Sequence, residues 1–188
     1  MTARALLLTI MALGWWRVPA ALGWSLDSAE THRRARSVAV GCATVVGVAM
    51  TLLAWLSGPI LDWLEVDTET FRIATGLVVA AVGLARTLGW GSRPEQAAYS
   101  NGRAGLAHNL WPVAYPVLSG PVTVAASISV GSDHGVALVL AGAVVGVGLT
   151  WFAGGLRGGG WAGHVVRFAG VVLMVLATAL IFDGLRDV

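Results

Sequence analysis

The feature that most constrains this chain is a set of long apolar runs without a charged residue. Residues 38–55 contain no charge, and neither do residues 135–152. An α-helix needs roughly 20 apolar residues to cross a hydrocarbon core about 30 Å thick, because each residue adds about 1.5 Å. Only 12% of the 188 residues are charged, against about a quarter in a soluble domain. We therefore expect an integral membrane protein.

Hydropathy and turn residues together predict six membrane-spanning helices, and hence an all-α polytopic fold. The predicted spans are Ala5–Leu26, Val38–Ile60, Phe71–Trp90, Leu106–Val130, Val136–Leu156 and Val165–Phe182. Residues 91–105 are rich in Gly, Ser, Pro and Asn, a composition typical of linkers. This linker would divide a single transmembrane domain, residues 1–188, into two halves of three spans, residues 5–90 and 106–184.

The basic residues predict how the spans are oriented. All 12 are arginines, and eight share one side if the spans alternate: Arg33, Arg34, Arg36, Arg86, Arg93, Arg103, Arg157 and Arg167. Most carboxylates fall on the other side. Because cytoplasmic loops carry an excess of Lys and Arg, both termini are expected outside the cytoplasm. The Ala, Gly, Val and Arg content is typical of a GC-rich bacterial genome, so the expected location is a bacterial cell membrane.

Residues 1–21 allow an alternative, a cleaved secretory signal peptide. Arg4, an apolar stretch and the sequence Val18-Pro19-Ala20 follow in the order of such a signal. Cleavage would leave the arginines of residues 33–36 outside the cytoplasm and reverse the charge bias. A first membrane span is therefore favoured.

The two halves contain similar segments, which suggests an internal repeat. Arg72 opens the sequence RIATGLVVAAVG and Arg167 opens RFAGVVLMVLA, and a glycine follows each arginine after 17 residues, at Gly89 and Gly184. Prolines also interrupt spans 1 and 4. Since each half has an odd number of spans, the second half would be inverted relative to the first. Inverted repeats with interrupted helices at matching positions are a common plan of secondary transporters. The alternative is a six-helix bundle with incidental prolines.

Three prolines interrupt the fourth predicted span: Pro112, Pro116 and Pro121. Proline removes a backbone donor and clashes with the carbonyl four residues back, so Gly120-Pro121 is predicted to break the helix near mid-membrane. A half-helix beginning at Pro121 would direct its N-terminal amides at the break and favour an anionic group. Ser119 and Thr123 could supply hydroxyl groups beside it. The alternative is a simple proline kink that neighbouring helices satisfy.

Span 1 has a matching feature, because Arg17 and Pro19 lie within its apolar run. A central arginine costs roughly 2.5–3.5 kcal/mol on insertion scales. Such residues usually face the bundle interior and have a function. We expect Arg17 to bind a substrate carboxylate across from the Gly120 break. The alternative is that Arg17 extends its side chain to the cytoplasmic surface.

The remaining residues predict no catalytic group. No two histidines or carboxylates have metal-ligand spacing inside a span, and Cys42 is the single cysteine. We expect no metal, no cofactor, no enzymatic activity and no nucleic-acid partner. Gly142 and Gly146 form a face of small residues that lets helices approach closely. Packing within the chain is favoured for this face, and a homo-oligomer formed through it is the alternative.

Residues 112–121, PVAYPVLSGP, resemble the second-half signature of the MarC family, in which a P-x-x-x-P run precedes a small residue and Gly-Pro. Residues 58–76 are similar to that family's loop and start of span 3, and residues 167–184 to its last span. The resemblance implies six spans, outward-facing termini and an inverted repeat. It also implies a place among lysine-exporter-like transporters, some of which carry small neutral amino acids.

Carried over by position, Pro116, Gly120 and Pro121 match the second-half motif. The first-half motif of the family, Asn-Pro-x-Gly, is replaced by residues 13–18, LGWWRV, where only Pro19 corresponds. Two tryptophans and an arginine make this half of the site bulkier and positive. We expect a secondary transporter or exporter of a small solute, such as a neutral amino acid or similar carboxylate. The expected binding residues are Arg17, Pro19, Pro116, Ser119, Gly120, Pro121 and Thr123. The alternative is a non-transporting membrane scaffold that supports a partner complex.

Overall fold

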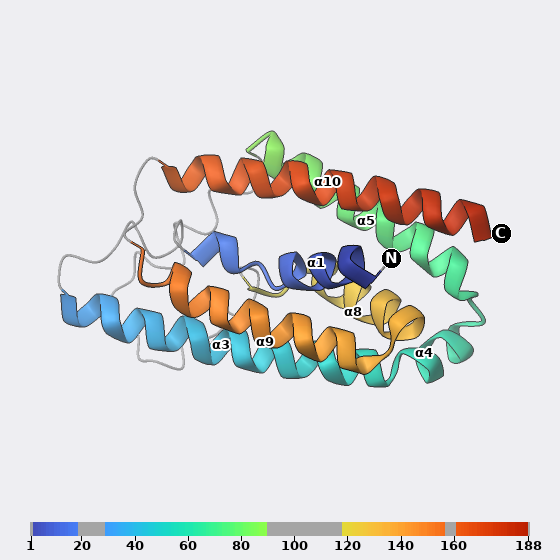
Figure 1. Cartoon of the computed structure of the whole chain (residues 1–188), viewed down its shortest axis with the longest axis horizontal. Coiled ribbons are helices and arrows are strands. Elements are labelled where there is room, and N and C mark those ends of the chain that lie inside the picture. Colours follow the sequence, from blue (N-terminus) through green and yellow to red (C-terminus); the bar gives the residue numbers. More distant parts are fainter. Residues whose placement is uncertain (1, 19–28, 90–117, 157–160, 188) are drawn as a thin grey trace.

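The computed structural model describes residues 2–18, 29–89, 118–156 and 161–187 (Figure 1). Within these ranges the chain forms seven α-helices and one 3-10 helix, and no strand. The all-α fold predicted from the sequence is therefore confirmed. The elements are α1 (Thr2–Ala12), η1 (Trp15–Arg17), α3 (Ala29–Trp55), α4 (Ser57–Leu64), α5 (Thr68–Thr87), α8 (Pro121–His134), α9 (Val136–Ala153) and α10 (Trp161–Asp187).

Four of the described helices are long and apolar enough to cross a membrane. They contain the segments Arg36–Trp55, Thr68–Thr87, Val136–Ala153 and Trp161–Arg186, which correspond to the second, third, fifth and sixth predicted spans. The first and fourth predicted spans do not form full-length helices in the described part of the chain. α1 is a shorter apolar helix, and α8 covers only the second half of the fourth predicted span. Residues 106–117 lie outside the described part of the chain, so the count of six spans stays a prediction.

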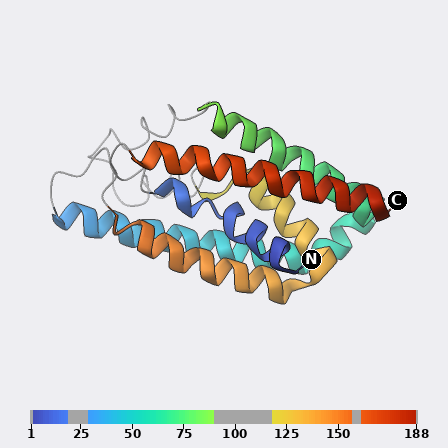
Figure 2. The same cartoon turned by 45° about the horizontal axis from the view of Figure 1, so that its top comes forward.

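The helices are arranged in three layers (Figure 1). α5 packs against α10 and α3 packs against α9, and these two pairs form the outer layers. α1 and α8 lie between them, as the turned view also shows (Figure 2). α1 contacts α9 and α10, and α8 contacts α3, α5 and α9. Two short helices are thus enclosed by four full-length ones.

The face formed by Gly142 and Gly146 is used inside the chain. A Cβ atom at Gly142 would lie 2.7 Å from Cβ of Thr9, and one at Gly146 would lie 2.6 Å from Cδ2 of Leu13. Small residues are therefore needed for the first span to approach α9. Gly142 and Gly146 therefore serve packing within the chain, as the sequence favoured, and a homo-oligomer through this face stays a prediction.

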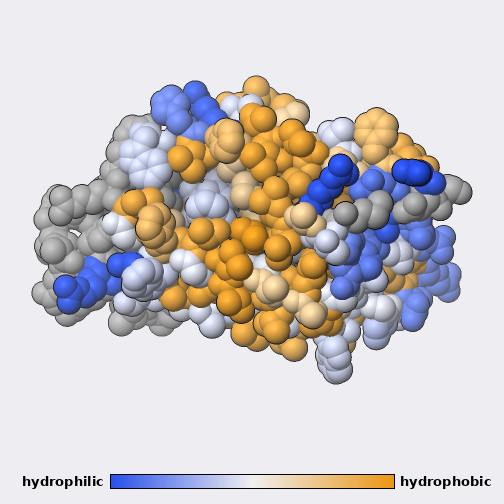
Figure 3. Space-filling model, viewed as in Figure 1, coloured by the Kyte–Doolittle hydropathy of each residue, from blue (hydrophilic) through white to orange (hydrophobic). Residues whose placement is uncertain are grey.

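The surface of the bundle carries an apolar band between two hydrophilic ends (Figure 3). Large apolar side chains are exposed on the outer helices, among them Val45, Leu77, Val144, Phe168 and Val175. A soluble monomer rarely exposes a contiguous apolar patch larger than a few hundred Å². The band has instead the character of a surface that contacts lipid.

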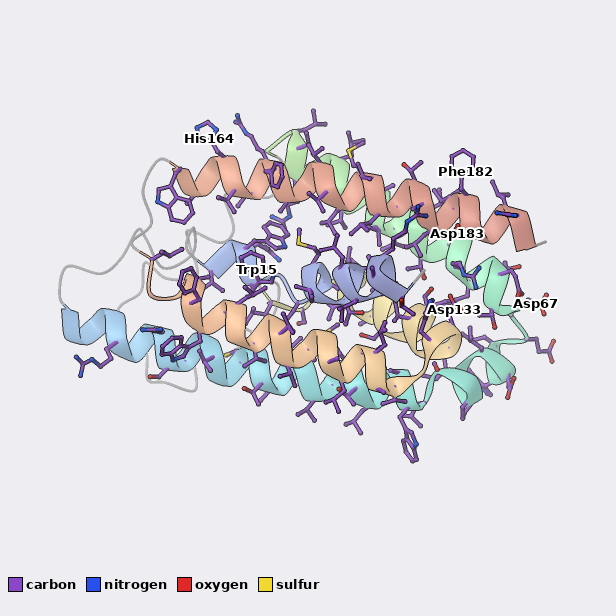
Figure 4. All side chains as sticks on the ribbon, in the orientation of Figure 1. Trp15, Asp67, Asp133, His164, Phe182 and Asp183 are labelled. Atoms are coloured by element: carbon purple, nitrogen blue, oxygen red, sulfur yellow. The ribbon has the colours of Figure 1, made fainter. Side chains whose placement is uncertain are left out.

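The two chain ends lie at the same end of the bundle (Figure 1). Asp67, Asp133 and Asp183 gather at this end too (Figure 4), as the predicted alternation of spans requires. The assignment of this end to the outside of the cell stays a prediction. At the other end, Arg36 donates from Nε to the Trp151 carbonyl oxygen over 2.8 Å, and its guanidinium lies 3.7 Å from the Trp151 ring centroid. Arg36 thereby satisfies an orphan carbonyl near the C-terminus of α9.

Candidate functional site at two helix breaks

The first predicted span is broken at Leu13 and Gly14. α1 ends at Ala12, and Gly14 adopts a left-handed conformation, with φ 68° and ψ 16°. Glycine adopts this conformation without the steric penalty of a side chain. The chain then continues as η1 to Arg17. The sequence predicted an interruption by Pro19, but the described break precedes Pro19, which itself lies outside the described residues.

The fourth predicted span is broken where the sequence predicted. Ser119 and Gly120 are not helical, and α8 begins at Pro121. Proline fits this first helical position because the N–H that it lacks would have had no partner within the helix. The Gly120 N–H donates to Oγ1 of Thr123 over 3.1 Å, which satisfies one amide at the start of α8. The alternative of a simple kink in a continuous helix is wrong.

A single side chain joins the two breaks. The Thr123 hydroxyl donates to the carbonyl oxygen of Ala12 over 2.8 Å. Ala12 is the last residue of α1, so its carbonyl has no partner within the helix. The C-terminus of α1 and the N-terminus of α8 therefore meet, near the middle of the long axis of the bundle (Figure 1).

A cavity of about 120 Å³, which we call the junction cavity, lies where the two helices meet. It brings together four of the predicted binding residues, Arg17, Gly120, Pro121 and Thr123. Ser119 adjoins it without being among the lining residues, and Pro19 and Pro116 lie outside the described chain. The described lining residues are Met11, Ala12, Gly14, Trp16, Arg17, Val82, Arg86, Leu118, Gly120, Pro121, Val122, Thr123 and Leu173.

Arg17 is buried in the bundle, with 6% of its surface exposed. Its guanidinium carbon lies 5.9 Å from the centroid of the Trp16 ring, within the range of a cation–π contact. The prediction that Arg17 faces the interior is confirmed, and the alternative that it extends to the surface is wrong. The two tryptophans that distinguish this segment are part of its packing, because Trp15 adjoins the core and Trp16 is buried in it.

Arg86 is the lining residue that the sequence interpretation missed. It is half-buried near the C-terminal end of α5 and lines the junction cavity together with Arg17. The sequence grouped Arg86 with the loop arginines that set orientation. Its place inside the predicted span Phe71–Trp90 was the signal that it belongs to the bundle, since intramembrane arginines usually face the interior.

Comparison with known proteins places the chain in a family. A family model described as "MarC family integral membrane protein" matches residues 3–188. The chain belongs to the MarC family. A relative, UPF0056 membrane protein PH0214 of Pyrococcus horikoshii, is 26% identical over 110 residues, which are 57% of this chain and 52% of the relative. The chain thus spans about half the length of this curated relative. No solved structure matches the chain.

The MarC family chain has a second cavity, of about 180 Å³, at the end of the bundle that holds both termini. We call it the terminal cavity. Nε of Arg72 donates to Oδ2 of Asp133 over 2.8 Å, and Nη1 of Arg4 lies 3.9 Å from Oδ2 of Asp183. Figure 4 shows Asp133 and Asp183 at this end, away from Trp15. Across the described residues, no group of three or more His, Cys, Asp or Glu side chains could hold a metal ion.

Proposed function

We propose that this MarC family protein is a secondary transporter, an exporter of a small solute that carries a carboxylate. The solute would bind in the junction cavity, between the C-terminus of α1 and the N-terminus of α8. One observation supports this most directly: two helix breaks, far apart in the sequence, meet at a cavity that a buried arginine lines.

The groups around the cavity favour a carboxylate. The N-terminus of a helix carries roughly half a positive charge, and the α8 N-terminus lies at the cavity. Arg17 adds a full charge and several N–H donors, which suit a carboxylate well. The cavity has a volume of about 120 Å³, a little less than the roughly 150 Å³ of an engineered protein cavity that binds benzene. The solute would therefore be compact, of the size of a small amino acid or hydroxy acid.

The pairing of the outer helices supports alternating access by two inverted repeats. The second and fifth predicted spans pair as α3 and α9, and the third and sixth pair as α5 and α10. Equivalent spans of two inverted halves would pair in this way around an axis through the junction cavity. We propose that the halves move against each other about the bound solute. The membrane would be a bacterial cell membrane, with both termini outside.

The proposal is tested by flux of labelled glycine, alanine and lactate through proteoliposomes that contain the native chain, Arg17→Gln or Pro121→Ala. We expect saturable flux that falls at least about 30-fold in Arg17→Gln, because a buried charge contact is worth about 2 kcal/mol or more. Pro121→Ala should also lower flux, since the helix could then continue through the break.

Arg4→Gln is the matched control, because Arg4 is exposed at the opposite end of α1. It should leave flux within about twofold of the native chain. Absence of flux for all three solutes, from protein shown to be folded, would exclude this class of substrate and favour a membrane scaffold without transport.

A further inference from the structure

An apolar groove of about 330 Å³ lies on the outer surface where α3 packs against α9. This groove, which we call the seam groove, is lined by residues between Thr44 and Leu52 of α3 and between Leu140 and Val147 of α9. We infer that it binds one anionic phospholipid, with an acyl chain in the groove and the phosphate at Arg36. The inference does not depend on the solute proposed for the junction cavity.

The lining of the seam groove suits a hydrocarbon chain. The hydroxyls of Thr44 and Thr51 donate to carbonyl oxygens of their own helix, those of Val40 and Gly47, each over 2.9 Å. An apolar occupant therefore leaves neither hydroxyl without a hydrogen bond. Gly47 forms the floor, because a Cβ atom there would lie 3.3 Å from Cβ of Ala143. The rest of the lining is apolar and belongs to the band that contacts lipid.

Arg36 and Trp151 lie at one end of the same helix faces. Side chains three or four residues apart share a face of a helix, so Arg36 lies above Thr44 on α3 and Trp151 above Val147 and Leu140 on α9. The two helices lie side by side in both ribbon views (Figures 1 and 2). From Trp151 to Leu140, α9 extends about 16 Å. Half of a hydrocarbon core is about 15 Å thick, so one acyl chain matches this length.

The guanidinium of Arg36 is held in place for a phosphate. Its Nε donates to the Trp151 carbonyl oxygen over 2.8 Å, and its carbon lies 3.7 Å from the Trp151 ring centroid. Arginine has five N–H donors, and this bond is the one that Arg36 makes to described residues. The two terminal amino groups can therefore donate to phosphate oxygens, for which their fork geometry is well suited.

A second arginine favours a lipid with a net negative charge. Arg33 is exposed one turn before Arg36 on α3, so both charges lie on the same face. Trp151 is 57% exposed, and tryptophan favours the level of the lipid headgroups. A zwitterionic headgroup would bring its own cation close to both arginines, whereas an anionic headgroup would not. The predicted orientation also places this end at the cytoplasmic leaflet, where anionic lipids give the surface a negative potential.

The test of the headgroup uses native mass spectrometry of the full chain in detergent, titrated with phosphatidylglycerol or with phosphatidylcholine of the same acyl chains. We expect the first phosphatidylglycerol to bind at least about fivefold more tightly than phosphatidylcholine. Arg33→Gln/Arg36→Gln should remove this preference, and Arg33→Lys/Arg36→Lys should keep most of it because the charges remain. Arg167→Gln, at an exposed arginine of α10, is the control and should leave the preference unchanged.

The test of the groove uses Val144→Phe, which fills it, and Val175→Phe on α10 as the matched control. The two valines are 63% and 65% exposed. Val144→Phe should weaken binding of both lipids by at least about fivefold, and Val175→Phe by less than about twofold. Equal affinity of the native chain for the two lipids, or a preference that survives in Arg33→Gln/Arg36→Gln, would overturn the headgroup site. Unchanged binding in Val144→Phe would overturn the groove, as would a lipid-free dimer in the native spectrum, which would identify a second copy as its occupant.

Discussion

The two cavities along α1 and α8 differ in the groups that form them. In the terminal cavity, Arg72 and Arg4 lie next to Asp133 and Asp183. In the junction cavity, the end of α1 meets the start of α8, and the Thr123 hydroxyl joins them. Matched charges can hold helices together without a ligand, whereas helix ends present backbone groups that need partners from outside their own helix. The terminal cavity therefore suits a structural role, and the junction cavity is where we propose that a solute binds.

This contrast predicts that the terminal cavity responds to mutation through stability. The Arg72–Asp133 pair joins α5 to α8, and its side chains are only 15% and 8% exposed. Asp133→Asn would leave the Arg72 charge without its carboxylate. We expect the free energy of unfolding to fall by about 3–5 kcal/mol, measured by reversible denaturation in nanodiscs.

The double variant Arg72→Gln/Asp133→Asn distinguishes a broken pair from a general packing defect. It should recover more than half of the loss, because no uncompensated charge is left. If the double variant is as unstable as the sum of both single variants, the pair contributes no coupling and the contrast between the two cavities is lost.

The contact between the two half-helices should have an intermediate effect on stability. Thr123→Val keeps the shape of the side chain and removes the hydroxyl that joins Gly120 to Ala12. The buried Ala12 carbonyl and the part-buried Gly120 N–H would lose a partner, so we expect a loss of about 1–3 kcal/mol in the same measurement. Thr178→Val on α10 is the control, because its exposed hydroxyl bonds only the Met174 carbonyl of its own helix. The control should change stability by less than about 0.5 kcal/mol.

The parts of the fold that the sequence predicted are those set by local chemistry. Continuous apolar runs predicted α3, α5, α9 and α10, because a helix that crosses lipid must be apolar over its full length. The start of α8 at Pro121 followed from the covalent structure of proline, which cannot continue a helix from the preceding turn. These features depend on neighbouring residues alone.

The parts that the sequence did not predict depend on tertiary contacts. Gly14 is one of 25 glycines, and its position as a break depends on distant contacts such as the packing of Leu13 against Gly146. Arg86 is separated from Arg17 by most of the first half, so nothing local indicates that both line one cavity. The bond from Thr123 to Ala12 joins residues 111 positions apart. The residues of the site could be named in part, but their arrangement could not.

The smallest effect on stability is expected from the second ion pair of the terminal cavity. Comparing the two ion pairs tests whether charge matching or burial determines their contribution to stability. Nη1 of Arg4 lies 3.9 Å from Asp183, and the two side chains are 65% and 27% exposed. Water and salt screen such a pair, so Asp183→Asn should lower the free energy of unfolding by less than about 1 kcal/mol. This loss in free energy of unfolding should vanish in about 1 M salt, where the screening length is roughly 3 Å. The effect of Asp133→Asn should persist there, because a buried pair is screened much less. Equal effects of the two substitutions at both salt concentrations would mean that the terminal cavity is wet throughout, and that burial does not set the Arg72–Asp133 pair apart.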